Sequence, residues 1–534
     1  MARLDRSPAA KEIAQIGAAI GREFSYELIA AVAPHTQTEL DSALNQLTES
    51  GLAFRRGTPP EATYTFKHAL LQDAAYDSLL KSRRQELHGE IARVLEDNFP
   101  ATKDTEPELR AHHFLRSANW AKALDYLERA NRKAIKANAV FDAKGFFEQA
   151  MRVLDALEDS DAHRRRRVAL IAAQVDIFIL ANQLDQYESY LERFAAVADG
   201  LSDQGLRGTF LSSLGHCQFG LARPLEAIKT LVPAAALCEQ ASHFEAAGRA
   251  YVHLQWSHLL TGEFEKAIFF EAPALAALAR APNLRLRLYA FGASAWANSR
   301  LGRWDQAIEK GMIGLAECEE AGDQSLITTA RWICALTHTY KGDVELALAH
   351  SKRGFDGAAT LGDHSWAQLG YGWAMIPRSP QHSIELIAPL VPMWLGRWWF
   401  DAVALVALGE AYLGAGELIQ ARATLEQAID VAQPRGMLFM VAPAQRLLGE
   451  VFLAMNLLDE SQTRFQQAIE LLERFKAENE IALARAGYGR LLQRLGRIAE
   501  ARDCFDRALE SFERLGTLNQ SDKLRDCIAA LPVD

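Results

Sequence analysis

The chain has 534 residues, which is too long for one compact domain and predicts several domains or an extended array. Its composition, 49% hydrophobic and 24% charged, excludes global disorder, and its net charge of −10 argues against a protein that binds nucleic acid through the phosphates. The N-terminus has no signal-peptide core, and no apolar stretch approaches the roughly 20 residues of a membrane span. We therefore expect a cytoplasmic protein without a membrane partner.

Residues 1–100 are predicted to form a small domain of their own. The segments IAQIGAAIGREFSYELIAAVA and TELDSALNQLTESGLAFRRG predict two or three short amphipathic helices, and alternating apolar residues at Tyr64 and Phe66 then predict a strand or wing. Helices followed by a small β-wing are the outline of a winged-helix domain. Residues 1–110 carry 13 Lys+Arg against 17 Asp+Glu, so a structural winged helix is favoured over one that binds DNA.

The same stretch resembles a known family. The segments IGREFSYELIAAV, GLAFRRG, YTFKHALLQDAAYDSLL and RRQELHGEIARVLE are similar to the region that follows the nucleotide-binding core of bacterial STAND-type signalling ATPases. In many of these proteins an adenylate/guanylate cyclase domain precedes the ATPase, and tetratricopeptide repeats end the chain. The resemblance covers about residues 4–160 and implies a regulatory region that works with an ATPase/cyclase module.

Motifs for nucleotide chemistry are missing from the sequence. It contains no GxxxxGK[ST] loop, and the metal-binding carboxylates of a cyclase cannot be placed. We therefore expect a chain that is not an enzyme and uses no cofactor, with any catalysis in a missing or partner chain. His112 and His113 are adjacent and would point about 100° apart on a helix, so a structural role is favoured over metal binding. The run from His163 to Val168, HRRRRV, is interpreted as a solvated helix face, with an acidic partner as the alternative.

An internal period of 40 residues runs through the rest of the chain, and such a period predicts a repeat array. One series consists of alanines with glycines five residues before the last three of them: Ala227, Ala267, Ala307 and Ala347, with Gly262, Gly302 and Gly342. A second series repeats a small residue, a turn residue and another small residue: Gly409, Gly449 and Gly489; Gly416, Asn456 and Gly496; Ala421, Ser461 and Ala501.

Each repeat is expected to be a helical hairpin. A small residue midway along the first helix lets the second helix approach, and Gly or Asn at the turn supplies the left-handed conformation that ends the first helix. Larger side chains then fill the gap between the helices: Leu425, Phe465 and Phe505. The pattern resembles the tetratricopeptide repeat, with about six residues more than the usual ~34. A HEAT or armadillo array is the alternative, and the Gly-to-Ala spacing favours the tetratricopeptide repeat.

The predicted fold class is therefore all-α, a tetratricopeptide-like α-solenoid preceded by a small winged-helix-like domain. We expect the winged-helix-like domain in residues 1–100, a first sub-array in 101–375, a degenerate repeat or hinge in 376–400, and a second sub-array in 401–534. The hinge is expected because prolines break the helices around it and Ser383 replaces the repeat alanine.

Aromatic residues predict a binding groove. Trp256 and Trp296 share one repeat position, six residues before Gly262 and Gly302, and in tetratricopeptide proteins that position lines the concave groove. Helical spacing places two more aromatic residues on the same face, Tyr289 and Trp332. Tryptophan is enriched at binding hot spots, so these four residues predict a groove for a peptide or small ligand. The alternative is that they fill space between long helices.

The sequence thus predicts a non-catalytic regulatory or sensor scaffold. It would bind a protein, peptide or effector through a helical-repeat groove and relay that binding to an ATPase/adenylate cyclase module. The alternatives are a stand-alone protein-interaction adaptor, a transcription regulator with a winged-helix DNA-binding domain, and an enzyme in its own right. The relay to an ATPase/cyclase module and the stand-alone adaptor make different predictions, since only the first expects the neighbouring coding region to encode a P-loop.

Overall fold

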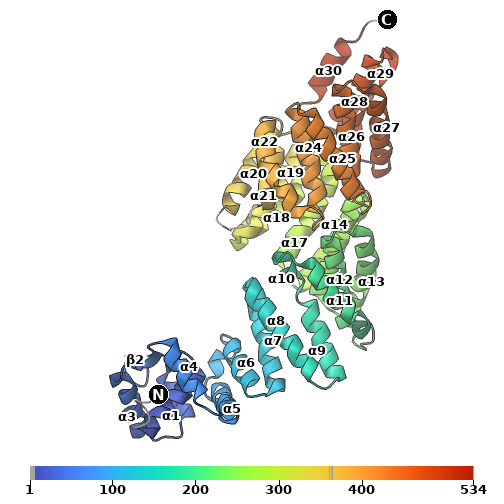
Figure 1. Cartoon of the computed structure of the whole chain (residues 1–534). Coiled ribbons are helices and arrows are strands. Elements are labelled where there is room, and N and C mark those ends of the chain that lie inside the picture. Colours follow the sequence, from blue (N-terminus) through green and yellow to red (C-terminus); the bar gives the residue numbers. More distant parts are fainter. Residues whose placement is uncertain (1–6, 360, 362–364, 533–534) are drawn as a thin grey trace. The chain divides into compact units, whose positions relative to one another are not determined.

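The computed structural model describes residues 7–359, 361 and 365–532. These residues are nearly all helical, with one small sheet near the N-terminus, which confirms the predicted all-α class (Figure 1). The winged-helix-like assignment of residues 1–100 stays a prediction. Within the described ranges, every helix is too short or too polar to cross a membrane. The chain forms two compact units, one running up to Leu170 together with Asp176–Asn182, the other comprising Ile171–Val175 and the residues from Gln183 onward.

The first unit begins with the order helix, strand, helix, helix, strand, strand. The strands form an antiparallel sheet with β3 in the middle, between β1 and β2. The predicted strand at Tyr64 and Phe66 is confirmed as β3, whereas β1 and β2 lie in segments predicted to be helical. These elements are α1 (Pro8–Ile20), β1 (Glu23–Ser25), α2 (Tyr26–Val32), α3 (Gln37–Glu49), β2 (Ala53–Arg56) and β3 (Thr63–Phe66).

The core of this small domain is aromatic. The ring of Phe24 on β1 lies 5.7 Å from the rings of both Tyr64 and Phe66 on β3, and all three side chains are buried. Alternation along β3 places these two rings on one face of the sheet, because successive side chains of a strand point to opposite sides. On α1, a Cβ at Gly17 would come within 2.6 Å of the Phe24 ring, so the helix can lie this close only with glycine there.

The first unit extends past residue 100. Arg110 on α6 is fully buried, and its guanidinium donates hydrogen bonds to the carbonyl oxygens of Leu95, Phe99 and Thr102. The Leu95 carbonyl lies in the last turn of α5, where helix carbonyls lack intrahelical partners, and the other two lie in the segment that follows this helix. The further helices are α4 (Ala69–Asp77), α5 (Lys81–Asn98), η1 (Pro100–Thr102), α6 (Pro107–Arg116), α7 (Trp120–Lys136) and α8 (Val140–Ala156); α9 (Asp161–Ala172) and α10 (Val175–Leu180) reach the boundary of the two units.

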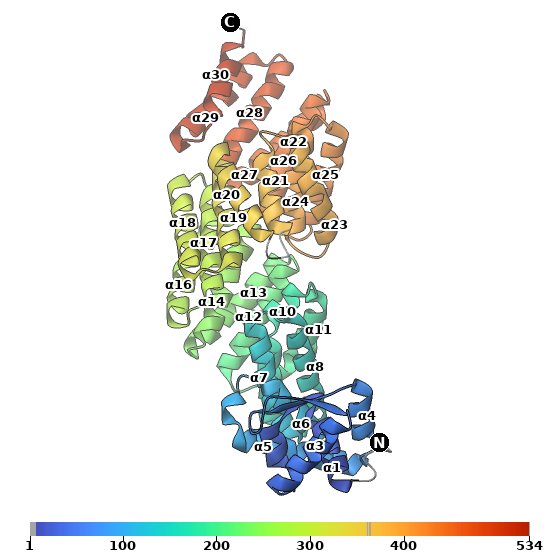
Figure 2. The same ribbon diagram turned by 90° about the vertical axis from the view of Figure 1, so that its left-hand side faces the viewer.

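The second unit is a succession of helical hairpins (Figures 1 and 2). We call α12–α20 the early repeats and α24–α29 the late repeats. The helix α11 (Leu184–Asp199) precedes the early repeats. The helices of the early repeats are α12 (Gln204–Gly220), α13 (Pro224–Gln240), α14 (Phe244–Leu260), α15 (Phe264–Phe269), α16 (Glu271–Arg280), α17 (Leu284–Arg300), α18 (Trp304–Ala321), α19 (Gln324–Lys341) and α20 (Val344–Ala358). The helices of the late repeats are α24 (Phe400–Gly414), α25 (Leu418–Ala432), α26 (Leu438–Ala454), α27 (Leu458–Phe475), α28 (Glu478–Arg494) and α29 (Ile498–Leu515), and α30 (Ser521–Ala529) follows them.

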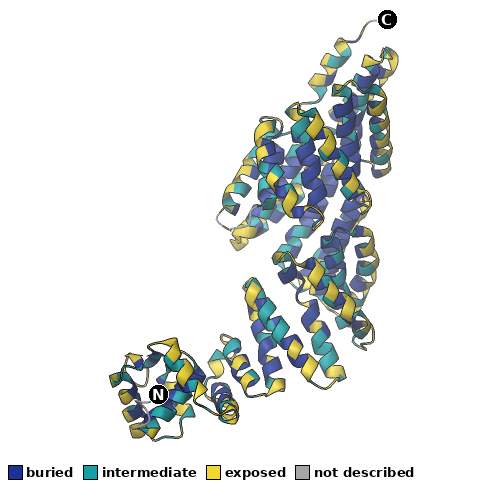
Figure 3. Ribbon diagram, viewed as in Figure 1, coloured by how far each residue is buried: buried dark blue, intermediate teal, exposed yellow. Residues whose placement is uncertain are grey.

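Small residues set the distance between the helices of each late hairpin. A Cβ at Gly409 would meet Leu425 at 2.5 Å, and one at Gly489 would meet Phe505 at the same distance, while Gly449 faces Phe465 in the same way. The predicted pairing of small and large residues is therefore confirmed. The first helices α24 and α26 are buried over most of their length, whereas the second helices expose one face (Figure 3).

The turn residues adopt the predicted left-handed conformation. Gly262, Gly302 and Gly342 have φ angles of +84°, +75° and +83°, and Asn456 has +59°. A side chain at such a position strains the backbone by about 1–2 kcal/mol. At Gly342 there is a second constraint, because a Cβ there would lie 2.6 Å from the carbonyl oxygen of Leu518.

We expect Gly342→Ala to lower the free energy of unfolding of the second unit by about 2–3 kcal/mol, since backbone strain and the collision with Leu518 add. Gly322→Ala is the matched control. Its φ is +66°, but nothing lies within 4 Å of the new Cβ, so about 1 kcal/mol is expected. Urea unfolding and hydrogen exchange around residue 518 measure both variants. Equal losses for the two would show that the Leu518 contact is not made in solution.

Prolines lie at the interruptions of the repeat pattern, although α13 and α26 each contain one without being divided. Pro273 lacks the N–H that would bond to the Phe269 carbonyl, and the second helix of that repeat is divided into α15 and α16. The segment predicted to be degenerate likewise contains only short pieces, and Ser383 at the alanine position is buried. The helix α21 (Ser365–Met375) ends just before this segment, and the short pieces within it are α22 (Pro380–Ile387), η2 (Ala388–Leu390) and α23 (Val391–Trp394). Its role as a hinge, and the four-part domain division, stay predictions.

Late repeats pack back onto early repeats within the second unit, and we call these contacts the repeat closure. A Cβ at Gly262 would meet the Phe475 ring at 2.7 Å, and one at Gly302 would meet Leu515 at 2.9 Å. The backbone N–H of Leu518 donates to the carbonyl of Lys341 at 2.8 Å. The turns that follow α14, α17 and α19 therefore contact the end of α27, the end of α29 and the residues just after α29.

Candidate functional site

The tryptophans predicted to line a groove lie inside the second unit. Trp256 and Trp332 are each 5% exposed and Trp296 is 1% exposed. The indole of Trp296 lies 6.0 Å from that of Trp256 and 5.7 Å from that of Trp332, so the three rings form one row along α14, α17 and α19. Tyr289 is partly buried beside them, and its carbonyl accepts a hydrogen bond from the Trp256 indole.

The repeat closure fills the space in front of this row. Trp399 lies 5.5 Å from Trp256 and 6.1 Å from Trp296, and Phe439 on α26 lies 5.6 Å from Trp296. The burial supports the alternative drawn from the sequence, in which these residues fill space between helices. A binding role for Trp256, Tyr289, Trp296 and Trp332 stays a prediction.

The corresponding positions of the late repeats line an open cavity. Glu410, Glu450 and Arg490 stand six residues before their turn residues, as Trp256 and Trp296 do, and Arg446 stands ten before, as Trp332 does. Together with neighbouring side chains they surround a cavity of about 890 Å³: Ile376, Pro377, Pro380, Glu410, Leu413, Gly414, Arg446, Leu447, Glu450, Leu453, Ala454, Arg490, Gln493 and Arg494. The first helices α24, α26 and α28 supply most of this lining.

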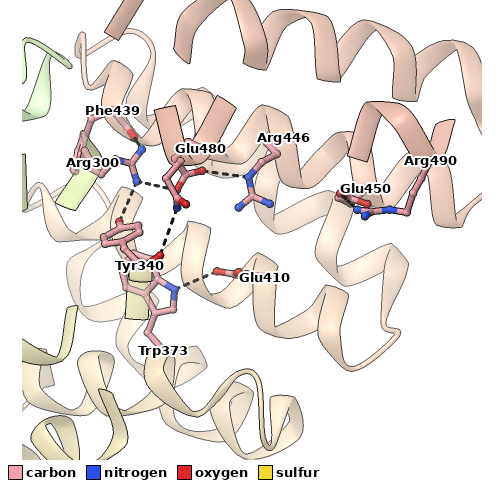
Figure 4. A network of polar contacts seen from close by, with 10 residues as sticks. Arg300, Tyr340, Trp373, Glu410, Phe439, Arg446, Glu450, Glu480 and Arg490 are labelled. Atoms are coloured by element: carbon pink, nitrogen blue, oxygen red, sulfur yellow. Dashed lines mark hydrogen bonds and ion pairs between the residues drawn. The ribbon is translucent and has the colours of Figure 1, made fainter. Parts of the chain in front are cut away.

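A buried ion network connects the cavity to the repeat closure (Figure 4). Arg446 donates through Nε to Oε2 of Glu480 at 3.3 Å, and the other carboxylate oxygen of Glu480 lies 3.5 Å from the guanidinium of Arg300. Arg300 also donates to the Tyr340 hydroxyl and to the Phe439 carbonyl. Because Arg300 belongs to an early repeat, Glu480 is shared between the closure and the cavity.

The other charged groups of the cavity are held by different partners. The carboxylate of Glu410 accepts a hydrogen bond from the Trp373 indole at 3.1 Å, and burial raises the pKa of Glu410 above its usual range. Glu450 pairs with Arg490 at 2.5 Å. Arg494 donates to the side-chain amide oxygen of Asn456 at 3.3 Å, which is a neutral partner.

The tryptophans of the predicted groove are buried, whereas the same repeat position faces an open cavity in the late repeats. The groove predicted from the sequence did not include the charged residues at this position of the late repeats. The signal was present in LGEAYLG, LGEVFLA and YGRLLQR, where the residue after each small glycine is Glu410, Glu450 or Arg490. These residues share one helix face with the positions three and four further on, which also line the cavity.

Histidines of the first unit form a separate buried cluster. The Nδ1 atoms of His88 and His113 are 2.8 Å apart, and the Tyr76 hydroxyl lies 2.9 Å from Nε2 of His88. Burial lowers the pKa of His88 to about 4, with smaller contributions from His112 and Arg116, and burial also lowers the pKa of His113. Among the described residues no group of three or more His, Cys, Asp or Glu side chains could hold a metal ion.

The first unit should lose stability in acid. The unfolded His88 binds a proton near pH 6.5 but the folded one only near pH 4, so the unfolded chain takes up the proton first. The stabilisation is complete above pH 6.5 and falls away toward pH 4, a loss of about 3 kcal/mol. Hydrogen exchange of residues 81–116 across this range measures it. His88→Gln should flatten the pH dependence, while the exposed control His382→Gln should not; equal slopes for wild type and His88→Gln would contradict the assignment.

The arginine run of α9 is paired within the chain. Arg166 bonds to Asp125 and Glu128 on α7, and Arg167 bonds to Asp155 on α8. The remaining two arginines pair with acidic residues close to the start of α9, Arg164 with Asp159 and Arg165 with Asp161. The run is therefore a half-buried, salt-bridged helix face rather than the solvated face expected from the sequence.

Comparisons with known proteins support the repeat assignment for part of the chain. Residues 440–514 match the family model described as tetratricopeptide repeat. The protein R02095 of Rhizobium meliloti (strain 1021) is 25% identical over 178 residues, which are 33% of this chain and 17% of that protein. The chain thus spans well under two thirds of this relative's length.

Two solved structures are also similar. The STAND protein with a tetratricopeptide repeat sensor, PH0952 from Pyrococcus horikoshii, has a TM-score of 0.49 at 12% identity, covering 80% of this chain and 63% of that one. A Rap protein complexed with competence and sporulation factor has a TM-score of 0.37 at 13% identity, covering 68% and 97%. With TM-scores below 0.5, these likenesses carry no argument of their own. Residues 440–514, which contain most of α26 through α29, are tetratricopeptide repeats within a nearly all-α chain.

Proposed function

We propose that the chain is a non-catalytic regulatory scaffold that binds a protein or peptide partner in the cavity of the late repeats. The observation that supports this most is the cavity itself, about 890 Å³ and lined by the inner positions of three consecutive first helices. In the early repeats the space in front of the equivalent position is occupied by other side chains of the protein, as Trp399 and Phe439 cover Trp296. The late repeats are the part of the array that leaves this face available.

The relay of binding is part of the same proposal. The first six elements, in the order helix, strand, helix, helix, strand, strand, are compatible with a winged-helix-like domain, and the sequence resemblance connects that domain to an ATPase/adenylate cyclase module. Glu480 provides a physical route by which an occupied cavity could affect the rest of the second unit, since it contacts Arg446 in the cavity and Arg300 in the closure.

A cavity-filling variant tests the proposal. Ala454 is an exposed cavity residue, so Ala454→Trp should obstruct the site without disturbing the core. The probe is a synthetic library of random decapeptides, passed over the immobilised full chain and identified by mass spectrometry. We expect wild type to retain a subset of peptides and Ala454→Trp to bind them at least about tenfold more weakly, equivalent to about 1.4 kcal/mol.

Ala423→Trp on the outer face of α25 is the matched control, because Ala423 is exposed and does not line the cavity. It should retain the same peptides as wild type. No retention by wild type, or equal retention by Ala454→Trp, would contradict the proposed function.

A further inference from the structure

The charges around the cavity do not balance. Its lining contains three arginines and two glutamates: Arg446, Arg490 and Arg494, with Glu410 and Glu450. Glu450 is already engaged by Arg490, so this pair contributes little net charge. Glu410 is half-buried and accepts a hydrogen bond from the Trp373 indole, and desolvation disfavours its charged form. Arg446 is paired with Glu480, which also contacts Arg300, so the cavity and its network hold four arginines and three glutamates, an excess of one positive charge.

Arg446 is the deepest of the three arginines. Its side chain is 12% exposed, and among the contacts of the described residues only Nε is hydrogen-bonded, to Glu480. Figure 4 shows its two terminal nitrogens pointing away from Glu480. A planar guanidinium held along one edge still offers N–H groups from its terminal nitrogens, and these match the two oxygens of a carboxylate. Glu480 itself is held on its far side by Arg300, which fixes the orientation of Arg446.

Arg494 adds a second positive charge at the cavity. It is exposed on the last turn of α28, and its hydrogen-bond partner, the amide of Asn456, carries no charge. A charge in this position attracts anions from solution and strengthens their binding, in a manner that weakens as salt is added.

The walls between these charges are apolar. Ile376, Leu413, Leu447 and Leu453 line the cavity together with Pro377 and Pro380. A small inorganic anion would leave these walls without a partner, whereas a peptide can present an acidic group and apolar neighbours at once. Binding sites of this kind combine apolar lining with a few placed polar groups.

We propose that the cavity binds an acidic peptide segment, with a carboxylate on Arg446, Arg494 steering it, and apolar neighbouring residues against Ile376, Leu413 and Leu453. This inference rests on the proposed function, in that a peptide occupies the cavity. The carboxylate can come from an Asp or Glu side chain or from the C-terminus of the peptide. Both sources have the same chemistry at the guanidinium.

The decapeptide library tests the inference in two forms, one with free C-terminal carboxylates and one amidated. We expect the peptides retained by wild type to be enriched in Asp and Glu, or to be retained only when the C-terminus is free. The first result assigns the carboxylate to a side chain and the second to the terminus. Retained peptides without either signature would overturn the inference.

A double-mutant cycle, with one change in the peptide and one in the protein, then tests whether the carboxylate contacts Arg446. Replacing the acidic residue of a retained peptide by its amide, or amidating its terminus, should weaken binding to wild type at least about tenfold. The same change should have little effect on Arg446→Met, because the partner of the carboxylate is gone. An undiminished peptide effect in Arg446→Met would overturn the role of Arg446.

Arg494→Gln keeps the test decisive should Arg446→Met fail to fold, because Arg494 is exposed. It should weaken the acidic peptide about threefold to tenfold and reduce the salt dependence of its Kd. Arg507→Gln is the matched control, since Arg507 is exposed on the outer helix α29 and pairs with Asp503. Equal Kd values and salt dependence for Arg494→Gln and wild type would overturn the electrostatic role.

Failure of the inference and failure of the proposed function are distinguishable. Peptides that are blocked by Ala454→Trp but lack a carboxylate signature leave the proposed function standing and remove the anionic recognition. Absence of any retained peptide removes both.

Discussion

Replacing Trp296 by alanine is expected to lower the free energy of unfolding of the second unit by about 3–5 kcal/mol. The side chain is 1% exposed and contacts aromatic rings from early and late repeats, including Trp256, Trp332 and Phe439. Its removal would leave a cavity that several rigid rings cannot refill, which is the costly case among large-to-small substitutions. Urea unfolding of the full chain, followed by tryptophan fluorescence and circular dichroism, measures the loss.

Phe269→Ala is the control for Trp296→Ala. Phe269 is also a large aromatic residue of the second unit but is 69% exposed, so less than about 1 kcal/mol is expected. If Trp296→Ala were as stable as Phe269→Ala and instead lost partner binding, the predicted groove would be restored and the interior role of the row withdrawn. The two outcomes differ in both stability and binding, so one pair of variants separates them.

The second large effect is expected from Arg300→Met. Arg300 is 1% exposed and Glu480 is 5% exposed, and they join an early repeat to a late one. Removing one partner of a buried ion pair costs about 3–5 kcal/mol, because the remaining charge stays buried. We expect about 3 kcal/mol, the lower end, since Glu480 retains Arg446. Unfolding in urea gives the magnitude, and faster hydrogen exchange at residues 439–480 would locate the loss at the repeat closure.

Two further variants separate the cost of breaking a buried ion pair from the cost of removing any arginine. Arg303→Met removes an arginine three residues away whose partner Glu265 is exposed, and it should cost less than about 1 kcal/mol. Adding Glu480→Gln to Arg300→Met should recover part of the loss, because the buried carboxylate is no longer charged. Equal costs for Arg300→Met and Arg303→Met would mean that the closure does not depend on this pair.

Local features were determined by the sequence alone. The spacing of Gly449, Asn456 and Phe465 specifies a close helix contact, a left-handed turn and the side chain that fills the gap, and all three are present. Such features depend on residues within one hairpin, so they can be read from the 40-residue period. The strands β1 and β2 escaped prediction because neither has the apolar alternation that marks β3, and they are stabilised by pairing with β3.

Only the tertiary structure decides whether this face of a repeat's first helix is buried or open to a ligand. Trp296 and Glu450 occupy the same position of their repeats, yet one is buried against Trp399 and Phe439 and the other lines an open cavity. The difference arises because the late repeats return to contact the early ones, through pairs as distant in sequence as Arg300 and Glu480. A repeat period describes each hairpin and its neighbours, but long-range contacts of this kind depend on the accumulated rotation of many repeats, which no single repeat encodes.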